Sequence, residues 1–273
     1  PTKIEVFPPA IKLAGPRRKM QLVVTGFYAD GQVQDLTRAA QFASSDAAIV
    51  SVDGTVAHPH KDGNAEITIT VGGQTAKSTV EVSAQTAPQA VSFEYDMLAA
   101  LSKQGCNAGA CHGSPSGKGG FRLSLRAFDP TVDKLTLIRE DLGRRTNVLT
   151  PDESLLLAKP LMKVPHGGGM KLKKADPAYT VMHDWIAQGC QQDAEGSARC
   201  VKIEVYPPTG RLLKRPAHTQ QICVLAHFAD GTVRDVTDLA CYSSSDTEVA
   251  DVNVDGLVVG HNRGEAAIVV RYM

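Results

Sequence analysis

Two cysteines and a histidine stand close together in GCNAGACHG, residues 105–113 of this 273-residue chain. Cys106 and Cys111 are separated by four residues, and His112 directly follows the second cysteine. Two thiols at a fixed distance can form thioether bonds to the two vinyl groups of a haem, and an adjacent imidazole can bind the iron. The spacing therefore predicts covalent attachment of one haem c through Cys106 and Cys111, with His112 as the proximal iron ligand.

Three other uses of these residues stay open. The usual haem motif has two residues between the cysteines, so the spacer at residues 107–110 would have to bulge outward. Cys106 and Cys111 could instead form a small disulfide loop. A structural zinc site would need a second closely spaced pair of ligands, and a thiol redox motif would prefer a two-residue spacer.

Helices are expected to position this stretch. Apolar residues from Phe93 to Leu101 recur at helical spacing and lead directly into the cysteine motif. A second helix is predicted from TPDESLLLAKPLM at residues 150–162, which opens with a capping box. A third is predicted to begin at Asp176 and Pro177 and to stop at Gly189.

The two ends of the chain repeat one another. Three blocks from the first copy recur 199 or 200 residues later, which indicates two homologous modules around a different middle. The matched blocks are KIEVFPP and KIEVYPP at residues 3–9 and 202–208, GFYADGQVQDLT and AHFADGTVRDVT at 26–37 and 226–237, and SSDAAIVSV and SSDTEVADV at 44–52 and 244–252.

Short alternating apolar and polar runs, separated by turn signals, predict a β-sandwich for each module. The ADG, D-x-T and SSD blocks resemble bacterial immunoglobulin-like domains of group 2. The middle, residues 93–189, resembles the c-type cytochrome domain of planctomycete surface proteins in CNAGACHG, PDESLLLAKPLMKVPHGGGMKL and YTVMHDWIAQG. The resemblance implies an all-α cytochrome c-like domain at residues 90–192 between two all-β sandwiches at 1–85 and 200–273, the second lacking its last strand.

The distal iron ligand is expected from the glycine-rich loop at residues 163–174. His166 lies in PHGGG, a motif associated with that family, which favours ligation by two histidines. Met170 is the alternative, because thioether ligation is common in cytochromes c and raises the potential. A role of His166 in capping the loop stays open, as does ligation by Met162, Met182, His183 or Cys190.

The charge and hydropathy of the chain argue against nucleic-acid binding and a membrane span, and its cysteine content bears on its compartment. The chain holds 29 basic and 29 acidic residues, so it lacks the excess of cations typical of nucleic-acid binders. No apolar run is long enough to span a membrane. Two further disulfides are possible, which would suit an oxidising compartment, although free thiols are an open alternative. The remaining cysteines are Cys190, Cys200, Cys223 and Cys241.

The sequence thus predicts an exported, periplasmic or cell-surface electron carrier rather than an enzyme. Its partner would be a redox protein or a downstream domain of the same polypeptide. One alternative is a haem site with a weak sixth ligand that handles peroxide or a small gas. The other is a haem-free adhesion fragment with a Cys106–Cys111 disulfide.

Overall fold

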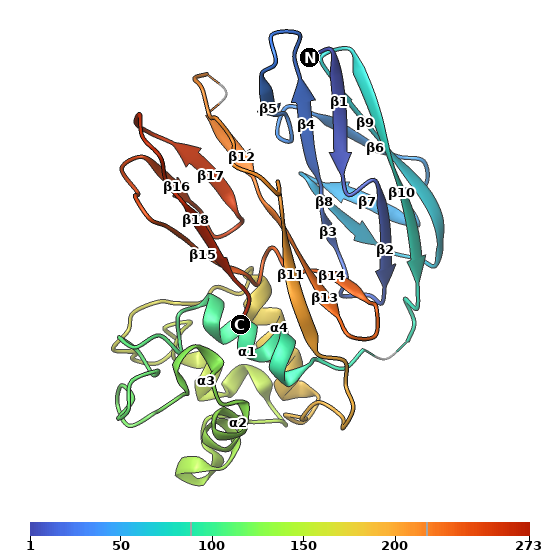
Figure 1. Cartoon of the computed structure of the whole chain (residues 1–273). Coiled ribbons are helices and arrows are strands. Elements are labelled where there is room, and N and C mark those ends of the chain that lie inside the picture. Colours follow the sequence, from blue (N-terminus) through green and yellow to red (C-terminus); the bar gives the residue numbers. More distant parts are fainter. Residues whose placement is uncertain (88, 217) are drawn as a thin grey trace. The chain divides into compact units, whose positions relative to one another are not determined.

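A computed structural model describes residues 1–87, 89–216 and 218–273, and the chain divides into two compact units (Figure 1). The first unit contains both copies of the repeat: Pro1–Gln89, the first module, and Arg199–Asp238 with Tyr242–Val270, the second module. The second unit, here the helix–loop unit, contains Ala90–Ala198, Leu239–Cys241 and Arg271–Met273.

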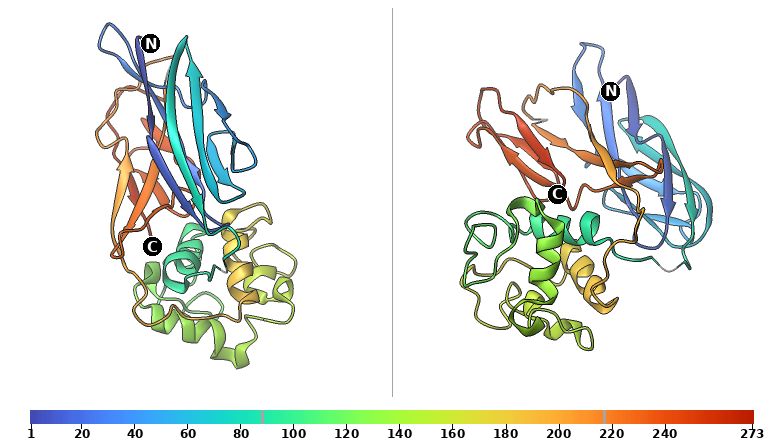
Figure 2. Two further views of the ribbon diagram at one scale, coloured as in Figure 1. Left: turned by 90° about the vertical axis from the view of Figure 1, so that its right-hand side faces the viewer. Right: turned by 60° about the horizontal axis from the view of Figure 1, so that its bottom comes forward.

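The first module consists of three small sheets around one core (Figures 1 and 2). Strand β10 alternates as predicted, with Val80 and Val82 buried and Glu81 exposed. The sheet orders are β2-β10-β9-β6, β1-β4-β5 and β3-β8-β7. The strands are β1 (Lys3–Phe7), β2 (Ala10–Ala14), β3 (Met20–Gln21), β4 (Val23–Phe27), β5 (Val33–Asp35), β6 (Gln41–Ser44), β7 (Val50–Asp53), β8 (Val56–Pro59), β9 (Gly63–Val71) and β10 (Gln74–Ser83).

The second module repeats most of this arrangement. Its sheets are β11-β13-β14, β12-β17-β16 and β15-β18, and within its described residues no strand corresponds to β2 or β10. The strands are β11 (Cys200–Tyr206), β12 (Thr219–Gln221), β13 (Cys223–Phe228), β14 (Val233–Asp235), β15 (Cys241–Ser244), β16 (Ala250–Val252), β17 (Leu257–Gly260) and β18 (Ile268–Arg271).

The helix–loop unit is held together by a core around Trp185, which is fully buried. The indole ring lies 5.3 Å from the Phe93 ring, and its N–H donates to the Gln191 carbonyl at 2.8 Å. The helical segments are a π-turn η1 (Phe93–Met97), α1 (Leu98–Lys103), η2 (Leu125–Ala127), α2 (Pro130–Ile138), η3 (Glu140–Gly143), η4 (Pro151–Glu153), α3 (Leu155–Ala158) and α4 (Pro177–Ala187).

The predicted all-α cytochrome c-like domain is wrong. The longest α-helices of the helix–loop unit, α2 and α4, have 9 and 11 residues, and most of the chain between the helices is turn or loop. Strands dominate the molecule as a whole. The apolar periodicity identified two helices, residues 93–103 and 177–187, but local spacing does not reveal how much irregular chain separates them.

The helix predicted over residues 150–162 is broken at Ser154, which adopts an extended ψ of 129°. Ser154 is buried, and its hydroxyl accepts the backbone N–H of Asn147 at 2.9 Å. The Thr150 hydroxyl bonds the Glu153 carboxylate at 2.9 Å instead of a backbone N–H. The predicted capping box therefore starts a single 3-10 turn rather than a long helix.

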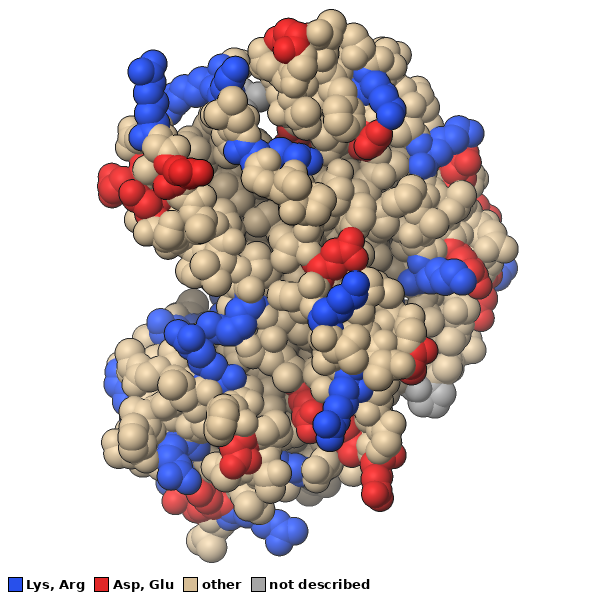
Figure 3. Space-filling view, viewed as in Figure 1, with Lys and Arg blue, Asp and Glu red and all other residues tan. Residues whose placement is uncertain are grey.

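Charges of both signs are interspersed on the face shown in Figure 3, in keeping with the balanced composition. No helix in the described part of the chain is long and apolar enough to cross a membrane.

Candidate ligand-binding pocket

The cysteine motif forms a compact loop directly after α1. The Cys106 N–H donates to the Leu101 carbonyl, and the His112 N–H donates to the Cys106 carbonyl, both at 2.9 Å. These bonds fold the motif back on itself, so Cys106, Cys111 and His112 line one pocket. Asn107, the first residue of the spacer, is buried, and its amide donates to the Ser102 hydroxyl at 2.8 Å.

The tautomer of His112 follows from its hydrogen bond. Nδ1 lies 2.8 Å from the Phe121 carbonyl oxygen, which can only accept, so Nδ1 carries the proton. Burial lowers the pKa of His112, which favours the neutral ring.

The glycine-rich loop brings His166 to the same pocket. Its Nδ1 donates to the Gly169 carbonyl at 2.7 Å. The Gly169 N–H donates back to the His166 carbonyl at 3.0 Å, and Gly169 has a positive φ of 71°. The turn that carries His166 is thus closed by its own glycine.

The two imidazoles face one another across the pocket. Their ring centroids are 6.5 Å apart and their planes differ by 20°. The cavity has a volume of about 460 Å³, and Phe121, Leu155, Leu156 and Pro160 supply apolar wall. His112 and His166, which are 54 residues apart in the sequence, therefore lie in one site.

The pocket is rimmed by positive charge, with five cationic side chains against the single carboxylate of Asp141. Arg145 is 6% exposed and is fixed by the Thr136 carbonyl at 2.6 Å and the Asp141 carboxylate at 2.5 Å. Its guanidinium lies 4.6 Å from the Phe121 ring centroid. Such a rim suits an anionic ligand. The other cations are Lys118, Arg144, Lys159 and Lys171.

Burial, and to a smaller extent the nearby Cys111, raises the pKa of the Cys106 thiol to about 12. Cys106 is therefore a protonated thiol at neutral pH. None of the six cysteines, all of which lie in the described ranges, forms a disulfide.

The other proposed ligands lie elsewhere. Met170 and Met162 are 59% and 45% exposed, and neither is part of the described pocket wall. Met182 and Cys190 are buried in the core around Trp185. The His183 ring contacts the Asp184 carboxylate at 3.2 Å.

Two imidazoles and two thiols line the same pocket. Two imidazoles that bind one metal ion from opposite sides have ring centroids about 6 Å apart, because each metal–nitrogen bond is about 2 Å long. The distance between His112 and His166 matches this value. The described residues contain no group of three His, Cys, Asp or Glu placed so that it could hold a metal ion.

Comparisons with known proteins do not place the chain in a family. No family model matches it, and no curated protein matches it. A solved structure of domains 5–6 of the S-layer protein SbsC covers 99% of this chain and 90% of that chain, at 13% identity and a TM-score of 0.35. That score is too low to carry an inference about this chain.

These findings correct the family assignment. The predicted membership in the planctomycete type of c-type cytochrome, with flanking group 2 immunoglobulin-like domains, is wrong, because no family model matches and the middle of the chain is not all-α. The electron-transfer function that rested on this resemblance is wrong with it. The cofactor is a separate matter, because it rests on the side chains themselves.

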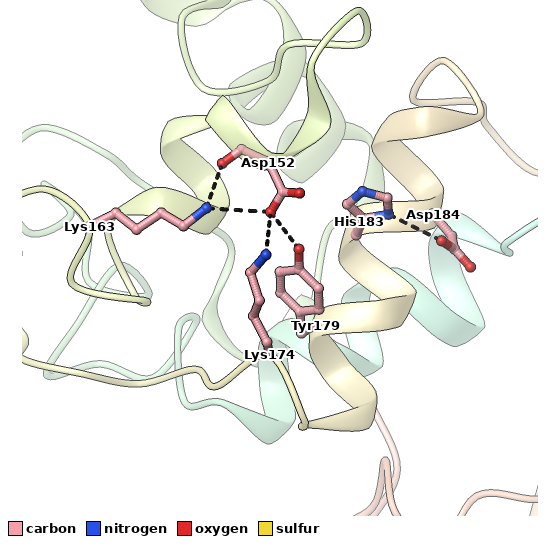
Figure 4. A network of polar contacts seen from close by, with 6 residues as sticks. All are labelled: Asp152, Lys163, Lys174, Tyr179, His183 and Asp184. Carbon is pink, nitrogen blue, oxygen red and sulfur yellow. Dashed lines mark hydrogen bonds and ion pairs between the residues drawn. The ribbon is translucent and has the colours of Figure 1, made fainter.

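The sequence did not predict a polar network around Asp152. Asp152 accepts the Tyr179 hydroxyl at 2.6 Å and pairs with Lys163 and Lys174, each at 3.4 Å (Figure 4). The hydrogen bond from Tyr179 is the largest cause that lowers the pKa of Asp152 to about 2. The two lysines flank the loop that carries His166, so Asp152 ties its ends together.

Proposed function

We propose that this chain is a segment of an extracytoplasmic, cell-surface protein that binds a small ligand at a haem-type site in the helix–loop unit. The observation that carries the proposal is the facing pair of imidazoles, His112 and His166, in a pocket that Cys106 and Cys111 also line. The function proposed is binding, not electron transfer and not catalysis.

The cofactor would be one haem c, which Cys106 and Cys111 would hold by thioether bonds and whose iron His112 and His166 would bind. The cationic rim would pair with the carboxylates of such a group. When bound, the group would supply an iron atom that small gases and cyanide can bind.

His166 is the weaker of the two ligands proposed. The His112 ring packs against Phe121 at 4.4 Å, and the backbone of its loop is tied to α1. The His166 ring is oriented by the carbonyl of its own turn. A small ligand could therefore displace His166 while His112 stays in place.

The test is an absorption spectrum of the chain produced in a host competent in cytochrome c maturation, followed by cyanide titration at neutral pH. We expect haem bands that survive acid–acetone extraction, and tighter cyanide binding for His166→Ala. His183→Ala is the matched control and should bind as the unchanged chain does. A colourless, folded product would overturn the proposal.

A haem-free surface segment is the second candidate, and it is favoured by the proximity of the two thiols. Cys111 lies close enough to affect the pKa of Cys106, so the pair could be oxidised to a disulfide in an oxidising compartment. A colourless product whose mass is two hydrogen atoms below that of the reduced chain would support this candidate. Replacing Cys111 by Ser should abolish this mass decrease.

A further inference from the structure

The two modules of the first unit hold each other through a reciprocal pair of hydrogen bonds. The Gln221 backbone N–H of the second module donates to Asp35 Oδ2 at 2.5 Å, and the Gln21 backbone N–H of the first module donates to Asp235 Oδ2. Both donors and both acceptors are equivalent positions, 200 residues apart. The same bond is therefore made twice, in opposite directions.

Each carboxylate is prepared for this bond inside its own module. The Thr37 hydroxyl accepts the Val24 N–H at 2.8 Å, and the Thr37 N–H donates to Asp35 Oδ1 at 2.8 Å. Asp235 Oδ1 is used in the same way by Thr237. One carboxylate oxygen thus stays within the module, and the other points to the neighbour.

An aromatic pair lies between equivalent residues of the same two modules. The Phe7 and Tyr206 rings, 199 residues apart in the repeat, are stacked with centroids 4.0 Å apart and planes within 2°. Equivalent residues meet in this way when two copies are related by a local twofold axis. Cys223 and Leu225 of the second module are also buried in the core of the first module.

We infer that this face of the module is a self-complementary docking surface whose partner is another module of the same repeat. An isologous interface has this signature, since residue i of one copy contacts residue j of the other and the reverse. A face shaped for an unrelated partner would not pair Asp35 with Gln221 and Asp235 with Gln21. The inference does not depend on what the pocket binds.

The experiment uses the full chain with a protease site inserted between the exposed residues Thr86 and Ala87. After cleavage of the folded protein, size-exclusion chromatography and a dilution series measure whether the two fragments stay together. We expect co-elution of the first module with the remainder. Immediate separation of the fragments would overturn the inference.

Two variants test whether the reciprocal bonds hold the fragments together. Gln221→Pro removes one N–H of the face and leaves the Asp–Thr networks intact, and Asp35→Ala with Asp235→Ala removes both acceptors. We expect each to weaken association at least tenfold. The matched control is Asp30→Ala with Asp230→Ala, which removes turn carboxylates that bond within their own turns. Association of the face variants as tight as that of the control would also overturn the inference.

Discussion

Backbone carbonyls decide what the two pocket histidines can do. The Phe121 carbonyl accepts a hydrogen bond from His112 Nδ1, and the Gly169 carbonyl accepts one from His166 Nδ1. Metal-binding histidines in proteins are generally oriented in this way, by a hydrogen bond from the ring nitrogen that does not bind the metal. The sequence could indicate that His112 and His166 were candidates, but not which ring nitrogen bonds the backbone, because that depends on how the loops fold.

The Cys106 thiol is expected to be nearly unreactive in the folded, haem-free chain. With its pKa at about 12, the thiolate fraction near pH 8 is about a thousandfold below that of a thiol at the ordinary value of 9.0. Alkylation by iodoacetamide, followed by peptide mass spectrometry, should label Cys106 about that much more slowly in the folded than in the unfolded chain. Equal labelling rates would contradict the raised pKa of this thiol.

Asp235 makes stability fall as pH rises. Burial raises its pKa to about 6, so between about pH 4 and pH 6 the folded chain holds a proton that the unfolded chain has lost. Protonated Asp235 contributes its full share to the free energy of unfolding below about pH 4. As the pH rises through about 6, the unfolding free energy falls by on the order of 1–3 kcal/mol. Urea unfolding at several pH values should show this slope.

The matched variant for that titration is Asp235→Asn, which keeps an oxygen acceptor and has no proton to lose. Its unfolding free energy should be flatter across the same pH range. An unchanged slope in Asp235→Asn would show that another group is responsible.

At the scale of elements, the cysteine loop requires one particular glycine. A Cβ at Gly113 would lie 2.1 Å from the Asn107 carbonyl oxygen, and Asn107 is buried. Gly113→Ala should therefore cost about 1–3 kcal/mol of unfolding free energy. In Gly109→Ala the new Cβ would meet only Leu125, at 4.0 Å, so this control should stay within about 0.5 kcal/mol. Equal losses in urea unfolding would contradict the loop structure.

The Asp152 network should control the opening of the loop that carries His166. Lys163 and Lys174 lie on either side of that loop, and both pair with Asp152 (Figure 4). In Asp152→Asn both ion pairs are lost, and trypsin should cleave after the loop lysines several-fold faster. Asp184→Asn, which alters the contact with His183, is the control. Unchanged cleavage in Asp152→Asn would show that other contacts hold the loop.

Sequence patterns predicted some elements well and others poorly, for physical reasons. Helix α4 was predicted because Pro177 and the apolar stripe that includes Met182 and Trp185 are local signals. The helix over residues 150–162 was not found, because Ser154 is held extended by the N–H of Asn147, a contact outside the helical pattern. The D-x-T blocks were visible only as markers of the repeat, since their partners lie some 200 residues away.

At the scale of the molecule, the chain is a β-rich protein with an inserted helix–loop unit. The local resemblance of the middle segment favoured an all-α domain, but strands in both modules and loops in the insert make up most of the structure. The pairing of the modules and the pocket are separate features in separate units. Each can therefore be altered without changing residues of the other.

The most direct test of the proposed site is the intact mass of the purified chain from a maturation-competent host, measured after acid–acetone extraction. The pocket of Cys106, Cys111, His112 and His166 predicts one haem retained per chain, and its loss from the chain with both cysteines replaced by Ser. A mass equal to the bare polypeptide, or lower by two hydrogen atoms, would contradict the haem-type site and leave the haem-free surface segment.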